Sequence, residues 1–158
     1  MIEVRSAIAA DADRLAELRW EFRSNRATPT VESREIFIAR CADWMRRELG
    51  AGGPWRAWIA AVDGGPIVGQ LWVQSIEKIP NPAAELERHA YISNLFVEPA
   101  HRGGAGTRLL AAALAWARAH DVDRVVLWPS ARSVSLYERF GFTRQGTVME
   151  LALEPTPR

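Results

Sequence analysis

The chain has 158 residues, of which 48% are hydrophobic and 25% are charged. These proportions suit a single domain over 1–158 and argue against wholesale disorder. Twenty basic residues stand against nineteen acidic ones, so the net charge of +1 gives no electrostatic case for binding nucleic acid or an anionic membrane. The lone Cys41 cannot form a disulfide within the chain, and the N-terminus carries carboxylates where a signal peptide needs an apolar core. We therefore expect a soluble, cytoplasmic protein.

Apolar periodicity divides the first half of the chain into three strands and two helices. In order, these are a strand over Ile2–Arg5, a helix that Asp11 or Asp13 can cap, a helix over about Ser33–Leu49, and strands over Trp55–Val62 and Ile67–Ile76. The last two strands are joined by Asp63-Gly64-Gly65, and Asp-Gly between two apolar runs indicates a hairpin.

The second half alternates strands and helices after a loop or short helix at Pro80–Ala90. Its expected elements are a strand over Tyr91–Val97, a helix over Thr107–His120, a strand over Arg124–Trp128, a helix over Val134–Phe140 and a closing strand over Val148–Leu153. Hairpins give antiparallel pairs, whereas the strand–helix–strand unit from Tyr91 to Trp128 requires a right-handed parallel crossover. The expected fold class is α/β (α+β): a mixed, mostly antiparallel sheet with one parallel βαβ crossover and helices on both faces.

A glycine-rich turn, His101–Gly106, separates a predicted strand from a predicted helix. The start of a helix presents unpaired N–H groups and the positive end of its dipole, so it suits phosphate. Glycines let the backbone amides point inward and remove Cβ atoms that would keep a phosphate away. A glycine cluster alone is also compatible with a simple turn, and the Gly-Lys-Ser/Thr of a P-loop is absent. The turn therefore predicts an anion site without naming the anion.

A second block, Trp128–Phe142, follows the glycine turn. Taken together, the two blocks resemble the GNAT superfamily of acyl-CoA N-acyltransferases, and a GNAT-like fold is therefore expected. The resemblance covers about Tyr91–Phe142. It rests on Gly104-x-Gly106 followed by Leu109-Leu110, on Ser130 at the family's Asn/Ser position, and on Leu136–Phe142, which matches Leu-Tyr-x-x-x-Gly-Phe.

The resemblance implies an N-acetyltransferase that moves an acetyl group from acetyl-CoA to an amine by direct attack in a ternary complex. The alternative is a catalytically inactive acyl-CoA-binding sensor or assembly module. The implied cofactor-binding residues are Phe96, Val97, His101, Arg102, Gly103, Gly104, Ala105, Gly106, Thr107 and Ser130. The loop after Pro99 is one residue shorter than the usual family pattern, so either His101 or Arg102 takes its leading position.

By the same resemblance, the strand Tyr91–Val97 separates from the next parallel strand, and the pantetheine arm pairs with its backbone. One N–H of Phe96 or Val97 would then polarise the thioester carbonyl. Tyr137 matches the tyrosine usually proposed to protonate the departing thiolate. The alternative for Tyr137 is a core aromatic with a satisfied hydroxyl.

The sequence assigns no general base and no metal site. The carboxylates Glu85, Glu87 and Glu98 read as surface charges, and a water positioned by Ser93 or Asn94 is an equal alternative. The three histidines are scattered, without metal-ligand spacing. The expected partner is a small-molecule or protein amine; neither nucleic acid nor membrane is expected. A homodimer is common among such folds, although the sequence indicates no interface.

Overall fold

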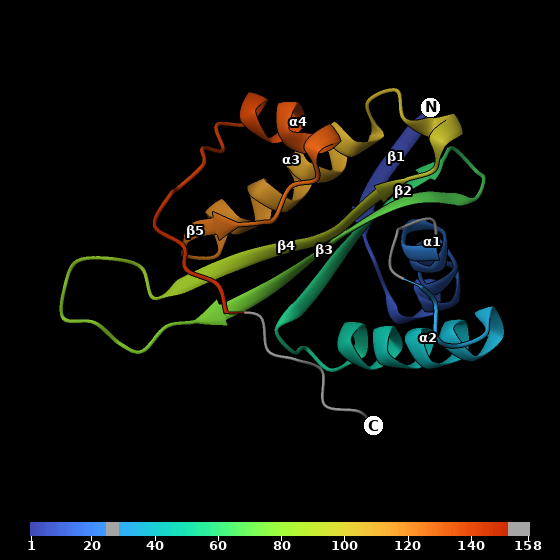
Figure 1. Ribbon diagram of the computed structural model, residues 1–158, viewed down its shortest axis with the longest axis horizontal. Helices are drawn as coiled ribbons and strands as arrows, with labels where there is room; N and C mark the ends of the chain where they lie inside the picture. The colour runs from blue at the N-terminus through green and yellow to red at the C-terminus, as the bar shows by residue number, and fades with distance from the viewer. Residues whose placement is uncertain (25–28, 152–158) are drawn as a thin grey trace. The chain divides into compact units, whose positions relative to one another are not determined.

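The computed structural model describes residues 1–24 and 29–151. Its elements, in chain order, are β1 (Ile2–Ser6), α1 (Ala12–Ser24), α2 (Arg34–Gly50), β2 (Trp55–Val62), β3 (Ile67–Glu77), β4 (Arg88–Val97), α3 (Ala105–Ala119), β5 (Val122–Val126) and α4 (Val134–Arg139) (Figure 1). The chain divides into two compact units, Met1–Trp128 and Pro129–Arg158. The single domain expected over 1–158 stays a prediction.

The first unit contains a five-stranded sheet in the order β1-β2-β3-β4-β5. Successive strands pair antiparallel up to β4, and β4 pairs parallel with β5. The turn after Val62 joins β2 to β3 directly, whereas α3 carries the chain between β4 and β5, as a parallel pair requires. The expected mixed sheet with one parallel crossover is confirmed.

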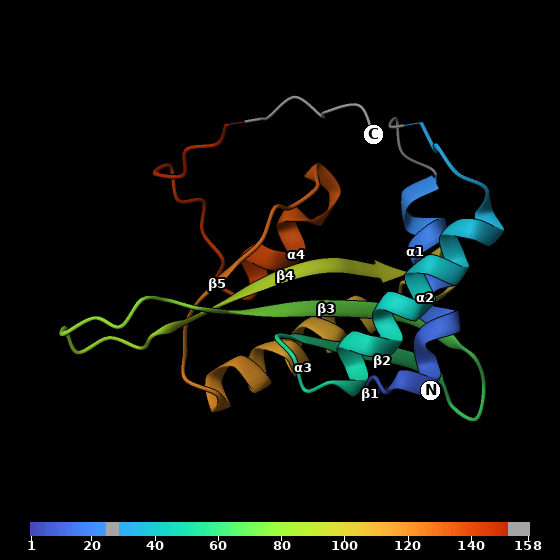
Figure 2. The same cartoon turned by 90° about the horizontal axis from the view of Figure 1, so that it is seen from below.

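Helices cover both faces of this sheet. Figures 1 and 2 show α1 and α2 on one face and α3 on the other. A core cluster between α1, α2 and the sheet consists of Ala12, Leu15, Ala16, Ala42, Met45, Ala57, Ile59 and Trp72. On the opposite face, α3 buries Leu109, Leu110, Ala113, Leu114 and Ala117. Neighbouring strand residues serve opposite faces: Ile59 joins the first cluster, whereas the Trp58 ring lies 6.0 Å from the Trp116 ring of α3.

The start of the first helix differs in detail from the prediction. Asp11 ends a short 3-10 helix (Ala9–Asp11) that leads into α1, and its carboxylate accepts a 2.9 Å hydrogen bond from the Ile8 N–H. Asp11 therefore caps this 3-10 helix, while Asp13 lies in the first turn of α1. The second helix is capped as its sequence suggests, because the Ser33 hydroxyl accepts from the Ile36 N–H.

The third and fourth strands are longer than the sequence indicated. β4 begins at Arg88 instead of Tyr91, because its first residues still pair with the end of β3, up to Glu77. The expected loop or short helix before Tyr91 is therefore a loop that ends in strand, closed by a 2.8 Å bond from the Lys78 N–H to the Glu87 carbonyl.

The expected closing strand, Val148–Leu153, is wrong over its described part. Residues 148–151 form no strand, and the side chains of Val148, Met149 and Leu151 are exposed. β-Branched and apolar residues favour a strand only where a partner strand supplies hydrogen bonds and a surface to pack against. Residues 152–153 lie outside the described residues.

Over the described residues, every helix is too short or too polar to cross a bilayer.

Candidate active site

The hydrogen-bonded pairing of β4 with β5 stops halfway along β4. It runs from Arg88 to Tyr91, whereas the pairing of β4 with β3 continues to Val97. In the part of the chain that the structure describes, the C-terminal half of β4 therefore has a strand partner on one edge only. Phe96 and Val97 lie at the end of this half. Unpaired strand groups of this kind are available to an extended ligand.

An irregularity marks this half of β4. The register with β3 shifts between Gln70 and Trp72, which face Phe96 and Ser93. Within the shift, Asn94 has a φ of 57°, a left-handed conformation that Asn tolerates better than most residues. The Asn94 side chain accepts a 3.0 Å hydrogen bond from the guanidinium of Arg19, on α1. The sequence alone did not predict this contact between Arg19 and Asn94.

The glycine turn connects β4 to α3. A 3-10 helix (Pro99–His101) follows Glu98, and Gly104 precedes the first residue of α3, which begins at Ala105, two residues before the predicted start. Gly104 has a φ of 106°, which side chains rarely allow. Its carbonyl accepts the first hydrogen bond of the helix, from the Arg108 N–H at 3.1 Å.

Several amides of this turn have no protein partner. Among the described residues, no backbone acceptor meets the N–H groups of Gly103, Ala105, Gly106 or Thr107. A Cβ at Gly103 or Gly104 would meet no other atom within 4 Å, so the backbone is open on that side. Free donors at a helix start, beside glycines that leave the backbone accessible, fit the pyrophosphate of an acyl-CoA.

The side chains of His101 and Arg102, the two candidates for contacting the phosphates, interact with the residues before the loop. His101 Nδ1 lies 3.5 Å from Glu98 Oε2; this nitrogen is buried and has no hydrogen-bond partner. Arg102 Nε donates a 3.4 Å hydrogen bond to the Val97 carbonyl. Neither contact distinguishes His101 from Arg102 as the residue in the leading position of the family's loop motif.

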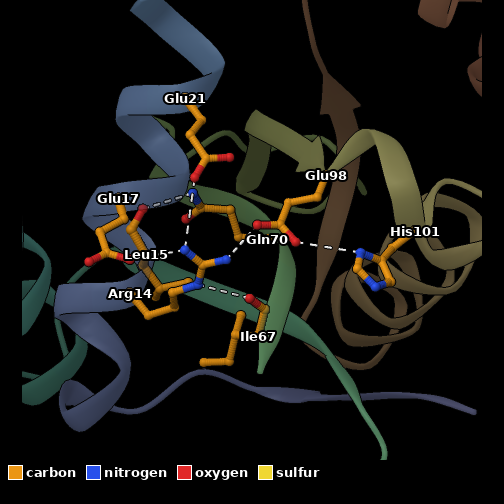
Figure 3. A network of polar contacts seen from close by, with 8 residues as sticks. All are labelled: Arg14, Leu15, Glu17, Glu21, Ile67, Gln70, Glu98 and His101. Atoms are coloured by element: carbon orange, nitrogen blue, oxygen red, sulfur yellow. Dashed lines mark hydrogen bonds and ion pairs between the residues drawn. The ribbon is translucent and has the colours of Figure 1, made fainter. Parts of the chain in front are cut away.

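A polar network surrounds Glu98, the residue between β4 and the loop (Figure 3). Arg14 of α1 lies at its centre and donates 2.5 Å from Nη2 to Glu98 Oε1. Burial lowers the pKa of the Arg14 guanidinium, but its hydrogen bonds to Glu17 and Glu98 outweigh this, and the net pKa is raised. The sequence predicted a surface charge at Glu98; instead, its carboxylate is largely buried and paired. No sequence motif connects Arg14 to it.

The other two candidate carboxylates hold a surface loop. Glu85 Oε1 accepts from the Asn81 side chain at 2.6 Å, and Glu87 Oε1 accepts from the Asn81 N–H at 2.9 Å. Through these contacts, both carboxylates stabilise the loop that connects β3 to β4. Across the described ranges, no group of three or more His, Cys, Asp or Glu side chains could hold a metal ion.

Ser130 and Tyr137 belong to the second unit, Pro129–Arg158. Ser130 precedes a short 3-10 helix (Ala131–Ser133) that leads into α4, and its hydroxyl lies 3.0 Å from the Ser133 hydroxyl. Tyr137 is buried, and its ring packs edge-on against Phe142 at 5.6 Å. Burial raises the pKa of the Tyr137 hydroxyl. No described residue forms a hydrogen bond with this hydroxyl.

The chain is similar to solved structures of acetyltransferases. A predicted acetyltransferase from Clostridium acetobutylicum, in a structure with acetyl-CoA, has a TM-score of 0.80 at 21% identity over 96% of each chain. A GCN5-related N-acetyltransferase from Ralstonia eutropha JMP134 has a TM-score of 0.70 at 22% identity, over 96% of this chain and 99% of that one. The aminoglycoside N-acetyltransferase AAC(6')-Iy, in complex with CoA, has a TM-score of 0.71 at 15% identity, over 98% and 96%. At such identities, the likeness shows the fold.

A comparison with curated proteins finds no match. The model of the acetyltransferase (GNAT) family, by contrast, matches residues 12–142. The matched span runs from the first residue of α1 to the end of the Leu136–Phe142 block and includes both the open half of β4 and the glycine turn. The chain therefore belongs to the GNAT acetyltransferase family.

Proposed function

We propose that this protein is an N-acetyltransferase that transfers an acetyl group from acetyl-CoA to an amine by direct attack in a ternary complex. The observation that carries the proposal is the half-paired end of β4, followed at once by a turn with free amides. Two of the similar structures support the cosubstrate, since one was determined with acetyl-CoA and another with CoA.

Each part of the chain has a distinct task in this proposal. The amides of Gly103, Ala105, Gly106 and Thr107 bind the pyrophosphate. Main-chain groups of Phe96 and Val97 pair with the pantetheine arm, and a preorganised N–H there stabilises the oxyanion that develops on the thioester carbonyl. Ser130 belongs to the cofactor-binding residues by its position in the family motif.

The transfer itself exchanges one bond for another. The amine nitrogen forms a bond to the carbonyl carbon, and the carbon–sulfur bond breaks. Tyr137 donates a proton to the leaving thiolate, a task for which its hydroxyl is free of other hydrogen bonds among the described residues. The proton that the amine loses passes to water or to a group of the acceptor pocket. Because Arg14 pairs with the Glu98 carboxylate, we do not assign Glu98 as the base.

The proposed acceptor is a small-molecule or protein amine. Neither nucleic acid nor a membrane surface is part of the proposal, since the charges of the chain nearly cancel. We propose a cytoplasmic location because the chain has a single cysteine, which suits a reducing compartment.

Calorimetric titration with acetyl-CoA tests the proposal. The wild type should bind saturably, and a variant with Gly104→Glu and Gly106→Glu should lose binding, because two carboxylates block the amides and repel the phosphates. The matched control is Gly146→Glu, which adds a carboxylate to an exposed position of the second unit where a Cβ meets nothing within 4 Å. Circular dichroism establishes that each variant is folded.

Absence of binding by the folded wild type would overturn the proposal. If binding is present, amines are then screened for release of the CoA thiol. Saturable binding without turnover of any amine would instead favour an acyl-CoA-binding module without catalytic activity.

A further inference from the structure

Glu98 connects the end of β4 to the glycine turn, and its backbone and side chain both form contacts there. Its N–H donates a 2.9 Å hydrogen bond to the Val68 carbonyl of β3, and its carbonyl accepts one of 2.9 Å from the His101 N–H. Its carboxylate meets Arg14 on one side and the His101 ring on the other. The orientation of Glu98 is therefore coupled to the first residues of the turn.

The Arg14 guanidinium forms three hydrogen bonds and a longer ion pair of 3.9 Å with Glu21 (Figure 3). Nη2 donates to Glu98, Nη1 donates 2.9 Å to Glu17 Oε2, and Nε donates 3.0 Å to the Ile67 carbonyl at the start of β3. The guanidinium is a planar fork with fixed donor directions, whereas a lysine ammonium is a compact point charge with rotatable donors. Arg14 thus connects α1, β3 and the beginning of the loop.

The adjacent residue of α1 supplies a second, buried connection. The Leu15 carbonyl accepts a 2.9 Å hydrogen bond from the side chain of Gln70, which is fully buried and also accepts from the Trp72 indole at 2.8 Å. This bond attaches α1 to β3 without involving Arg14. The contact between Arg14 and Glu98 is therefore a separate link, directed from α1 to the glycine turn.

The negative charge of Glu98 also affects anion binding by the adjacent turn. A carboxylate beside a turn that binds an anion opposes that binding, and the opposition is strong where water screens poorly. The Arg14 and Glu98 side chains are 30% and 22% exposed, so they are largely withdrawn from water. Arg14 is the cation that faces Glu98, and it also pairs with Glu17 at 2.9 Å and lies 3.9 Å from Glu21. Its positive charge therefore offsets the negative charge of Glu98 beside the turn.

We propose that Arg14 is a positioning residue for acyl-CoA binding: it orients Glu98, and through Glu98 the turn Pro99–Gly104, and it offsets the charge of the Glu98 carboxylate that would repel the CoA phosphates. This inference rests on the proposed function and assigns part of its cosubstrate site to a side chain of α1.

The test compares the dissociation constant for acetyl-CoA, by calorimetry, among four proteins: wild type, Arg14→Met, Glu98→Gln and the double variant. In Arg14→Met the Glu98 carboxylate stays without its cation, and we expect the constant to rise about tenfold, equivalent to about 1.4 kcal/mol. In the double variant the repelling charge is gone, so most of the affinity should return. A role confined to the stability of α1 predicts no such recovery.

Arg5→Met is the matched control. Arg5 forms an ion pair of 2.8 Å with Asp11, next to the start of α1. Among the described residues, it forms no hydrogen bond or ion pair with Glu98 or the glycine turn. Its loss should leave the dissociation constant for acetyl-CoA unchanged.

The outcomes separate this inference from the proposed function. A wild type that does not bind acetyl-CoA contradicts the function itself. A wild type that binds, beside an Arg14→Met variant that binds equally well, overturns the inference alone, as does a folded double variant that recovers no affinity. If Arg14→Met does not fold, Arg14→Lys replaces it: loss of the planar fork should weaken binding several-fold, and wild-type affinity would contradict the positioning role.

Discussion

At the scale of single residues, Tyr137 combines a buried ring with a hydroxyl that forms no hydrogen bond to the described part of the chain. Its pKa is raised by burial, because a phenolate is disfavoured away from water. The hydroxyl therefore stays protonated throughout the neutral range and is available as a proton donor. The sequence offered a proton donor or a core aromatic as alternatives, and the structure gives Tyr137 features of both.

Replacing Tyr137 with Phe should separate these roles. We expect kcat to fall by about a hundredfold, the lower range for loss of an acid–base group, because the thiolate must then leave without a positioned proton. The dissociation constant for acetyl-CoA should change little, since the ring remains. Steady-state kinetics with an amine found by thiol release provides the measurement. An unchanged kcat would show that Tyr137 serves as a core aromatic alone.

Tyr137→Phe should also change how the thermal stability of the protein depends on alkaline pH. The folded-state pKa of Tyr137 lies above its ordinary value of 10.0, so the group binds its proton more tightly in the folded state. Its contribution to stability is complete below pH about 10 and is lost as pH rises towards the folded-state pKa. Thermal melts between pH 8 and 11 should therefore show a steeper decline of Tm for wild type than for Tyr137→Phe. Parallel declines would contradict the buried phenol.

At the scale of secondary-structure elements, the contact between β3 and β4 leaves little room for a side chain at Gly69. Gly69 faces Val97 in the sheet register, and a Cβ there would lie 3.0 Å from Val97 Cγ2 and 3.1 Å from the Phe96 carbonyl. One of these contacts is backbone, which yields less readily than the end of a flexible side chain. The absence of a side chain at Gly69 therefore lets β3 support the part of β4 assigned to the pantetheine arm.

Gly69→Ala should accordingly destabilise the protein by about 1–3 kcal/mol, the usual cost of overpacking, and weaken acetyl-CoA binding by displacing the end of β4. Urea unfolding and calorimetry measure the two effects. Gly50→Ala is the control: its Cβ meets nothing within 4 Å at the end of α2, and it should be neutral or slightly stabilising. Equal stability of the two variants would show that β4 moves aside without cost.

Most elements were predictable because their signals are local. Ser33 before the second helix, the Asp-Gly turn between β2 and β3, and the apolar face of α3 each depend on a few neighbouring residues. The bounds of β5, which are Val122–Val126 instead of the expected Arg124–Trp128, were not predictable in this way. The same holds for the closing strand that the structure does not form. A strand exists only where another strand pairs with it, and pairing joins residues far apart in the sequence.

At the scale of the whole molecule, the chain is expected to unfold as one cooperative unit. The sequence predicts one domain, and the structure contains two compact units, Met1–Trp128 and Pro129–Arg158. All five strands lie in the first unit, whereas Tyr137 lies in the second. A single catalytic domain requires both units to be ordered together.

We therefore expect one thermal transition by scanning calorimetry, with a van't Hoff enthalpy equal to the calorimetric enthalpy. Acetyl-CoA should raise the midpoint of this single transition, because a ligand that binds only the folded state stabilises it by mass action. Two resolved transitions, or a calorimetric enthalpy well above the van't Hoff value, would contradict the single domain.

By itself, the sequence determined the mixed sheet, the helices on its two faces and the family, because periodicity, turn residues and the two motif blocks are all contiguous features. It also located the glycine turn, whose free amides follow from the start of a helix. Only the tertiary structure decided where the pairing of β4 and β5 stops, how Arg19 contacts Asn94, and that Arg14 pairs with Glu98. These contacts join residues separated by dozens of positions. They depend on how β4 and β5 pair and on how α1 packs against the sheet, which no local pattern encodes.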